Sequence, residues 1–286
     1  MDELISIAID LLFNFLDYIA LKLEKILINK KNLISSLQKF PMRAPFNHCV
    51  IDDFLDDEFA DIISGEFPDY YSSDWHIYDN PLENKKTSNN WNSFPPNTYR
   101  LLSYLVSLDF VNLLSKELSL DLFPDPGLHG GGWHIHGKGG NLNPHLDYSI
   151  HPKSGLLRKL NIIIYLSKDL KPEYGGHFGL WSKSNKNSEN LELVKEIEPH
   201  FNRAVIFDTT QESWHGISRK IMVPTGVYRK SLAVYYLTYP DSNSDPRTRA
   251  LFAPREDQTG DESIADLIKS RADDKKFSTV YRTKHD

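Results

Sequence analysis

A histidine and an aspartate two positions apart, His145 and Asp147, are the first residues whose types and spacing suggest metal chemistry. In an extended chain, side chains at i and i+2 point to the same face, so this imidazole and this carboxylate would lie together as two ligands of one ion. The chain contains 11 histidines, so a His-x-Asp triplet can arise by chance and does not define a site alone. His215 supplies a third candidate ligand, shortly after the strand-like run at 204–207.

The arginine that begins the last strand-like run, Arg229, adds a second chemical function. Two histidines and one carboxylate that leave coordination positions open form the facial triad of non-haem Fe(II) oxygenases. The open positions admit a bidentate keto acid and then O2. The distal carboxylate of the keto acid needs a buried cation, and arginine offers a planar, always charged fork. Ser231 shares a strand face with Arg229 by the period of two and can donate a further hydrogen bond.

The elements that must position these residues are mainly short strands. Apolar runs between turn signals predict strands at 161–166, 177–181, 204–207 and 231–238, and strands of this length and spacing indicate a sandwich or jelly-roll barrel. Upstream we expect a strand at 48–51, a helix at about 57–66 capped by Asp56 or Asp57, a long loop at 70–97 and a helical region at 98–120. Downstream we expect a polar surface extension or lid with one helix at about 261–271.

The sequence therefore divides into three predicted parts. They are an apolar helical segment at 1–40, an oxygenase-like domain at 41–240 with its core at 129–239, and a polar C-terminal extension at 241–286. The polar residues of the first helix, Ser6, Asp10, Asn14 and Asp17, form one narrow stripe on an otherwise apolar surface. They argue against a membrane span. The apolar surface must be covered by the chain's own domain or by a second copy in a homodimer; the alternative is a membrane surface or a partner protein.

The composition excludes several classes of protein. A net charge of −6 argues against a nucleic-acid binder, which would normally carry a basic excess. The single cysteine, Cys49, cannot form a disulfide within the chain, so a reducing compartment, the cytoplasm, is the expected location. No signal peptide is expected, because the first residues lack a basic segment and a small-residue cleavage site.

An ordered series of motifs covers residues 129–239. They are Gly130-Gly-Gly-Trp133, Gly139-Gly140, His145-Leu-Asp147, His151-Pro152, and the runs at 158–166, 174–181, 201–208, 214–216 and 229–236. As a set they resemble the prolyl-4-hydroxylase-like branch of the 2-oxoglutarate/Fe(II) oxygenase superfamily, and residues 45–67 resemble the opening of such proteins. The resemblance implies a double-stranded β-helix (jelly-roll) core, with helices packed on it, in a mainly β (α+β) fold.

The resemblance also implies roles for single residues. His145, Asp147 and His215 would hold Fe(II), and Arg229 would pair with the distal carboxylate of 2-oxoglutarate. Some relatives use lysine for this pairing, which makes Lys230 the fallback, although strand alternation turns Lys230 to the other face. The implied reaction consumes O2, converts 2-oxoglutarate to succinate and CO2 and hydroxylates a C–H bond, with ascorbate as a candidate reductant. Because the carboxylate ligand is present, hydroxylation is favoured over halogenation.

Two positions depart from the family pattern. His136 stands where some members have a tyrosine, and Phe178 stands where a threonine is common, so collagen-type prolyl specificity does not carry over. His136 is predicted to contact the cosubstrate or the substrate; a second metal bound with His134 is the less favoured alternative. Tyr165 either hydrogen-bonds the keto acid or fills the barrel.

Arg158 either reaches a carboxylate or merely stands at the start of a strand, and the second prediction is favoured. Residues 132–139 match most of a phosphate-binding loop, but no serine or threonine follows the lysine and no parallel sheet surrounds them, so nucleotide binding is rejected.

Two other functions compete with the oxygenase. A non-redox jelly-roll metal enzyme, such as a sugar epimerase or isomerase, needs the histidines but not Arg229 and Ser231. An inactive binding module on the same fold needs neither. The primary substrate is open: a peptidyl prolyl group, a free amino acid, a saccharide and a lipid precursor are all compatible with the sequence.

Overall fold

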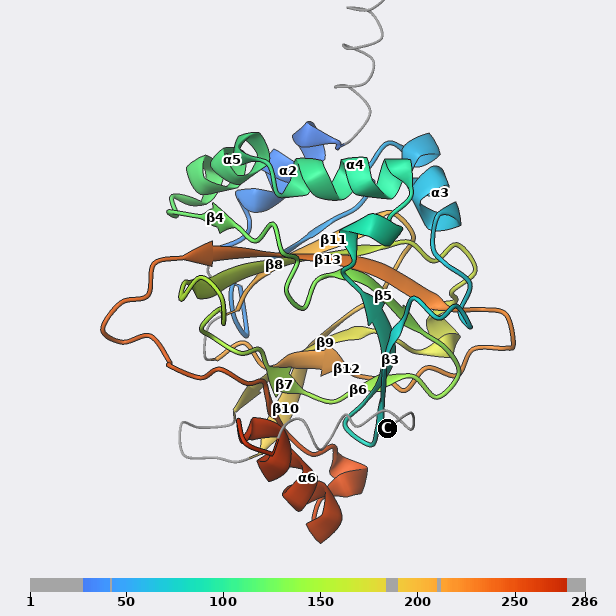
Figure 1. Ribbon diagram of the computed structural model, residues 1–286, viewed down its shortest axis with the longest axis vertical. Helices are drawn as coiled ribbons and strands as arrows, with labels where there is room; N and C mark the ends of the chain where they lie inside the picture. Colours follow the sequence, from blue (N-terminus) through green and yellow to red (C-terminus); the bar gives the residue numbers. More distant parts are fainter. Residues whose placement is uncertain (1–27, 42, 184–189, 210–211, 277–286) are drawn as a thin grey trace, which may run out of the picture.

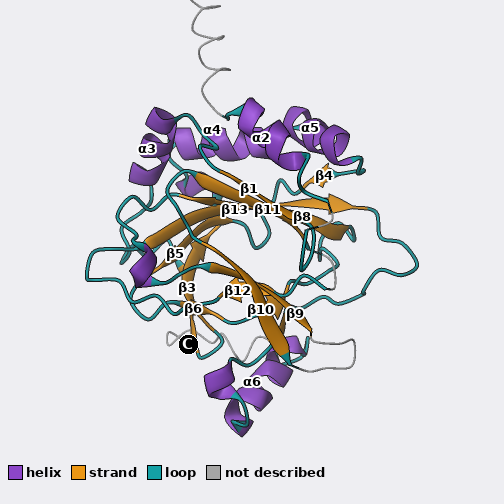
Figure 2. Cartoon of the chain, turned by 180° about the vertical axis from the view of Figure 1, so that it is seen from behind, coloured by secondary structure: helices purple, strands orange, loops and turns teal. Residues whose placement is uncertain are grey.

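Two antiparallel β-sheets face one another, and helices cover the outer face of the larger sheet (Figures 1 and 2). The computed structural model describes residues 28–41, 43–183, 190–209 and 212–276. This two-sheet arrangement with flanking helices confirms the predicted mainly β, jelly-roll class. Within the described ranges, no helix is long and apolar enough to cross a membrane.

The larger sheet contains the strand that begins with Arg229. Its order is β1 (His48–Ile51), β11 (Arg203–Asp208), β8 (Leu157–Tyr165), β13 (Arg229–Thr238), β5 (Gly132–His136), β3 (Glu83–Ser88) and β2 (His76–Asn80), with β4 (Phe123–Pro124) beside β13 and β6 (Asn141–Leu142) beside β3. The smaller sheet carries the candidate metal ligands. Its order is β10 (Leu191–Ile197), β9 (Phe178–Lys183), β12 (His215–Ile217), β7 (His145–Leu146) and β14 (Leu251–Phe252).

Alternation along the central strands separates the core from the site. On β13, Leu232, Val234 and Tyr236 are fully buried in the main hydrophobic core, together with apolar residues of the helices. The intervening positions face the other sheet and include Arg229 and Ser231. Because successive side chains of a strand point to opposite faces, one strand serves both the core and the site.

Four helices form the layer over the larger sheet. They are α2 (Lys30–Leu37), α3 (Asp57–Gly65), α4 (Pro96–Leu105) and α5 (Leu108–Leu118). Asp56 caps α3 by accepting hydrogen bonds from the backbone N–H groups of Glu58 and Phe59, which confirms the predicted start of this helix. The helical region expected at 98–120 is instead two helices. The break lies at Val106 and Ser107, where the Ser107 hydroxyl caps α5 by accepting from the Phe110 N–H at 3.3 Å.

The prediction of a long loop at 70–97 is wrong. This segment forms the hairpin β2–β3, the short 3-10 helix η1 (Trp91–Ser93) and the start of α4. The side chain of Asn80 organises the hairpin turn by accepting from the N–H groups of Leu82 and Glu83. The strands are polar because one face of the hairpin lines a cavity and β2 is exposed, so the apolar alternation that signals a strand is missing.

The C-terminal residues are more than the surface extension that the sequence suggested. The predicted helix exists as α6 (Glu262–Ala272), capped by Asp261. Before it, however, β14 adds a strand to the smaller sheet directly beside β7. The apolar helix expected at 1–40 falls largely outside the described residues, so its covering partner stays a prediction; only α2 is described there.

Candidate metal centre and cosubstrate pocket

The three candidate metal ligands come together on two neighbouring strands. His145 on β7 is directly opposite His215 on β12, and Asp147 follows two residues after His145. One ligand atom from each residue lies within 4.8 Å of the others. His145 Nε2 is 3.7 Å from Asp147 Oδ1, and His215 Nε2 is 3.8 Å from Asp147 Oδ2. All three side chains are buried, so the sequence pattern of an i, i+2 pair and a distant histidine becomes one compact donor set.

Hydrogen bonds fix the orientation of both imidazoles. Nδ1 of His145 donates to the Asn143 carbonyl at 3.0 Å, and Nδ1 of His215 donates to the Ser213 carbonyl at 2.8 Å. A neutral imidazole with its proton on Nδ1 keeps the Nε2 lone pair available, here toward Asp147. Burial lowers the pKa of both histidines, that of His145 to about 3, so the rings are neutral at physiological pH.

The carboxylate at this centre stays ionised although it is buried. Burial raises the pKa of Asp147, but His215 and the Arg158 guanidinium outweigh that effect and lower it overall. Its Oδ2 atom accepts no hydrogen bond from the described residues. Two neutral imidazoles and an ionised carboxylate with a bare oxygen fit the donor set of a non-haem Fe(II) site.

Aromatic rings hold the ligands in place. Phe252 of β14 stacks on the His145 ring, with centroids 5.2 Å apart and planes at 21°. Phe207 and Phe178 lie against His215 at centroid distances of 4.6 and 5.7 Å. The rings restrict rotation of both imidazoles and keep bulk water from this side of the centre.

Arg158 contacts the carboxylate of a candidate ligand, which was the less favoured of its two predicted roles. Its Nη1 is 3.6 Å from Asp147 Oδ1, and its guanidinium lies 3.5 Å from the ring centroids of both Tyr148 and Tyr235. It also donates to the carbonyl of His129 and to the Tyr148 hydroxyl. The predicted contact with a carboxylate is therefore confirmed, and the favoured prediction of a residue merely at the start of a strand is wrong. Its strand also contains Lys159 and Asn161, so the sequence around Arg158 gave no clear signal for this contact.

The predicted cosubstrate residues lie on three adjacent strands of the larger sheet. In β13, Arg229 is opposite His136 of β5, and Ser231 is opposite both His134 of β5 and Tyr165 of β8. All are buried. Arg229, Ser231 and His136 line the same cavity as the metal ligands. Tyr165 instead packs with Phe178 and other apolar residues between the sheets, with its ring centroid 4.9 Å from the Arg229 guanidinium carbon.

Arg229 is a buried cation without an anionic partner. Its side chain donates from Nε to the Gly176 carbonyl at 2.8 Å, and among the described residues no carboxylate lies within ion-pair distance. Burial lowers the pKa of Arg229. An unpaired buried charge is costly, and an anionic ligand would remove that cost. The pocket therefore fits the distal carboxylate of a keto acid such as 2-oxoglutarate.

The packing of the Arg229 side chain explains why residue 176 is a glycine. Gly176 has φ = +79°, and a Cβ atom there would lie 2.9 Å from Cδ of Arg229, so only glycine lets the arginine pass. Lys230, the fallback cation, lies on the opposite face, as strand alternation predicts. Its Nζ donates to the Ser64 carbonyl at 3.1 Å and lines a separate hollow of about 320 Å³.

A cavity of about 740 Å³ joins the metal ligands and Arg229 to the hairpin β2–β3 and the C-terminal segment. Its wall also includes Asn161, Tyr235, Lys85 and Arg249. A volume of this size is typical of sites for small molecules or for one residue of a larger chain.

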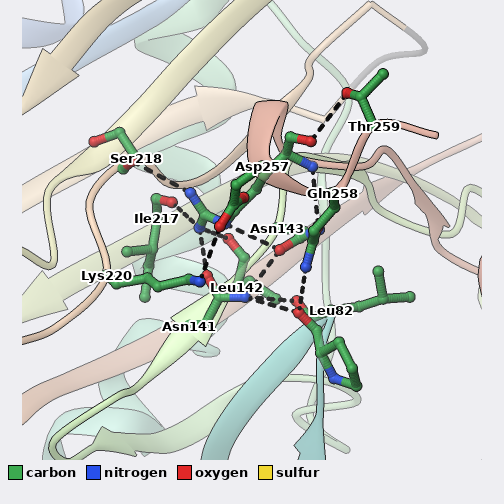
Figure 3. Close-up of polar contacts among 12 residues, drawn as sticks. Leu82, Asn141, Leu142, Asn143, Ile217, Ser218, Lys220, Asp257, Gln258 and Thr259 are labelled. Atoms are coloured by element: carbon green, nitrogen blue, oxygen red, sulfur yellow. Dashed lines mark hydrogen bonds and ion pairs between the residues drawn. The ribbon is translucent and has the colours of Figure 1, made fainter. Parts of the chain in front are cut away.

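The C-terminal segment is tied to the strands that carry the ligands (Figure 3). Asn143, two residues before the first ligand, donates to Gln258 Oε1 at 2.6 Å and accepts from Arg255 Nε at 3.0 Å. Arg255 also donates to the carbonyl of Ile217 on β12. Arg247 Nη2 donates to the Asp147 carbonyl at 2.9 Å. These bonds make residues after 245 part of the support of the site.

Comparison with known proteins agrees with this geometry. Residues 131–237 match the family model described as "2OG-Fe(II) oxygenase superfamily". A mouse protein named prolyl 3-hydroxylase OGFOD1 is 24% identical over 207 residues, which cover 71% of this chain and 35% of the mouse protein. The chain thus spans about a third of the length of this relative. The match confirms the predicted resemblance to 2-oxoglutarate/Fe(II) oxygenases of the prolyl-hydroxylase type and the predicted cofactors, Fe(II) and 2-oxoglutarate.

Solved structures of prolyl hydroxylases are also similar. The prolyl-4-hydroxylase of Pseudomonas putida is 14% identical with a TM-score of 0.48, covering 72% of this chain and 98% of its own. A prolyl hydroxylase of Trichoplax adhaerens, in complex with a hypoxia inducible factor peptide fragment, is 15% identical with a TM-score of 0.49, covering 73% and 91%.

Proposed function

Residues 131–237 match the 2OG-Fe(II) oxygenase superfamily, and from this premise we propose that the chain is a dioxygenase that hydroxylates a C–H bond. In the proposed reaction, O2 and 2-oxoglutarate are consumed, and 2-oxoglutarate leaves as succinate and CO2. The observation that carries this proposal is the pairing of two features in one cavity. A buried His-Asp-His cluster and a buried arginine without a carboxylate face the same space.

In this proposal His145, Asp147 and His215 hold Fe(II), which supplies the oxidising chemistry when bound. The carbonyls of Asn143 and Ser213 keep the imidazole lone pairs directed at the ion. Arg229 binds the distal carboxylate of 2-oxoglutarate, and the Ser231 hydroxyl donates to it. The resulting geometry orients the keto acid, because one end is fixed by the arginine and the other reaches toward the ligands.

Three further side chains have supporting roles. Arg158 positions Asp147 through its contact with Oδ1 and is itself clamped by two tyrosine rings. His136, buried beside Arg229, contacts the cosubstrate. Tyr165 packs against the Arg229 guanidinium and does not line the cavity. Buried aromatic side chains around the ligands exclude water from the reacting groups.

The substrate proposed for a first test is a prolyl residue, because the mouse relative is named a prolyl 3-hydroxylase. A saccharide or a small molecule is the next class, since the cavity is polar as well as large. The cytoplasm is the proposed location, because the only cysteine, Cys49, is buried as a free thiol whose pKa burial raises to about 12. A homodimer through the N-terminal helix is the proposed assembly.

The test is optical and needs no substrate. Fe(II) and then 2-oxoglutarate are added to metal-free protein without oxygen, and the visible spectrum is recorded. The proposal expects a metal-to-ligand charge-transfer band that requires both additions and that Lys230→Met retains. A folded, iron-loaded protein without this band would move the non-redox metal enzyme to first place.

A further inference from the structure

The cavity that holds the candidate metal centre carries an excess of positive charge, although the whole chain carries −6. Among the described residues, its lining contains five basic side chains and three acidic ones. The basic ones are Lys85, Arg158, Arg229, Arg249 and Arg271, and the acidic ones are Asp74, Glu83 and Asp147. Fe(II) and the dianion 2-oxoglutarate cancel one another, so the excess persists when both are bound. Such a charge balance favours an anionic group as a further occupant of the cavity.

Three of these five cations already have a carboxylate partner in the protein. Arg158 contacts Asp147, and Arg249 forms an ion pair with Asp274 at 2.7 Å. Arg271 donates two hydrogen bonds to the buried carboxylate of Glu83, at 3.1 and 3.0 Å. These three arginines are therefore committed to neighbouring carboxylates, and Arg229 is reserved for the cosubstrate in the proposed function.

Lys85 shares its carboxylate partner with an arginine. Its Nζ is 3.3 Å from Glu83 Oε2, while Arg271 donates to Oε1 of the same carboxylate, so one carboxylate serves two cations. The Lys85 ammonium also lies 4.9 Å from the Tyr78 ring centroid. The Lys85 side chain is only 13% exposed. Lys85 lines the same cavity as His134 and the candidate metal ligands. An ammonium in this position is a strong, compact donor for a carboxylate.

The alternation of side chains along β3 places Lys85 on the face that lines the cavity. Glu83, Lys85 and Thr87 occupy alternate positions and line the cavity. Lys86, the next residue, points to the other face, where its Nζ lies 3.8 Å from the Tyr70 ring centroid and donates to the Tyr70 carbonyl at 2.7 Å. Two adjacent lysines thus have the same chemistry and opposite surroundings.

Resting on the proposed function, we propose that Lys85 determines substrate class by binding a carboxylate of the primary substrate, close to the C–H bond that is oxidised. The substrate is then an acid: either the carboxylate belongs to the residue that is hydroxylated, or it belongs to a neighbouring acidic side chain. A neutral saccharide or a cationic substrate would leave the excess charge of the cavity unbalanced.

The test uses the relaxation of small probes by Mn(II), loaded in place of iron with saturating 2-oxoglutarate. Methyl protons of acetate and of acetamide are compared at equal concentration. We expect faster relaxation for acetate, and we expect this difference to fall about fivefold in Lys85→Met, which corresponds to about 1 kcal/mol for one partly buried charge contact. Lys86→Met is the matched control and keeps the wild-type difference. Lys85→Met leaves Glu83 paired with Arg271, so no unpaired carboxylate is created and the variant is expected to fold.

Two outcomes overturn the proposal. One is an acetate effect that Lys85→Met leaves unchanged; the other is a loss of 2-oxoglutarate affinity in Lys85→Met, which would assign the lysine to the cosubstrate. Failure of Mn(II) or 2-oxoglutarate to bind the wild-type protein would contradict the proposed function itself, and with it this inference. N-acetylproline and N-acetylprolyl-glutamate amide, each compared with neutral N-acetylprolinamide, then distinguish a carboxylate on the reacting residue from one on its neighbour.

Discussion

Replacing Arg229 by methionine should have opposite effects on cosubstrate binding and on the stability of the empty protein. Arg229 is 4% exposed, and its Nε donates a hydrogen bond to the Gly176 carbonyl at 2.8 Å. Loss of that bond costs about 1 kcal/mol, and removal of a desolvated, unpaired charge returns a similar amount. The free energy of unfolding of the empty protein should therefore change by no more than about 1 kcal/mol.

The affinity for 2-oxoglutarate should fall much further. A buried, charge-assisted contact between guanidinium and carboxylate contributes about 3 kcal/mol, which is about 100-fold in Kd. Urea denaturation of the metal-free protein and titration calorimetry of the Mn(II)-loaded protein measure the two quantities. Lys230→Met, on the opposite face of the same strand, is the control and should change neither value strongly. The reasoning is refuted if Lys230→Met loses 2-oxoglutarate binding while Arg229→Met keeps it.

Three other perturbations test separate parts of the site. His215→Ala removes one of three candidate ligands, so Mn(II) affinity measured by electron paramagnetic resonance should fall at least about 100-fold, and an unchanged affinity would place the metal elsewhere. The pKa of His134, lowered to about 3 by burial, means that only the unfolded chain binds its proton between pH 6.5 and about 3. Stability of the metal-free protein should thus fall as the pH drops below 6.5, and His134→Gln should remove up to about 1.4 kcal/mol per pH unit of that slope in urea titrations; identical slopes would contradict the assignment. Gly176→Ala puts a Cβ atom 2.9 Å from Arg229 at φ = +79°, so we expect a loss of about 1–3 kcal/mol in stability together with weaker 2-oxoglutarate binding, and wild-type values for both would show that the pocket can relax.

The sequence predicted the parts of this structure that depend on strong local patterns. The β-branched run at 162–164 predicted a central strand, and the Asp56 cap predicted the start of α3. The candidate ligands could be found because an i, i+2 pair in extended chain has only one geometric outcome. The strand face shared by Arg229 and Ser231 follows from the same period of two.

What the sequence did not predict depends on contacts between distant segments. The hairpin β2–β3 has polar residues where a strand normally shows apolar alternation, because its inner face lines a cavity. The role proposed for Arg158 depends on its contacts with Asp147 and two tyrosine rings, and the local sequence does not reveal these contacts. The contribution of the C-terminal segment was also hidden, because β14 has only two residues and its partner β7 is equally short.

That short pairing makes the support of the first candidate ligand depend on residues more than 100 positions later in the chain. The strand with the first ligand lies between β12 and β14, and 110 positions separate Asn143 from Ala253, with which it is hydrogen-bonded. A ribosome delivers the chain from its N-terminus, so all three candidate ligands emerge before the residue that stacks on His145. A nascent or truncated chain that ends before Phe252 would therefore have every donor atom but an unsupported first ligand. We expect such chains to bind the metal more weakly than chains that include β14.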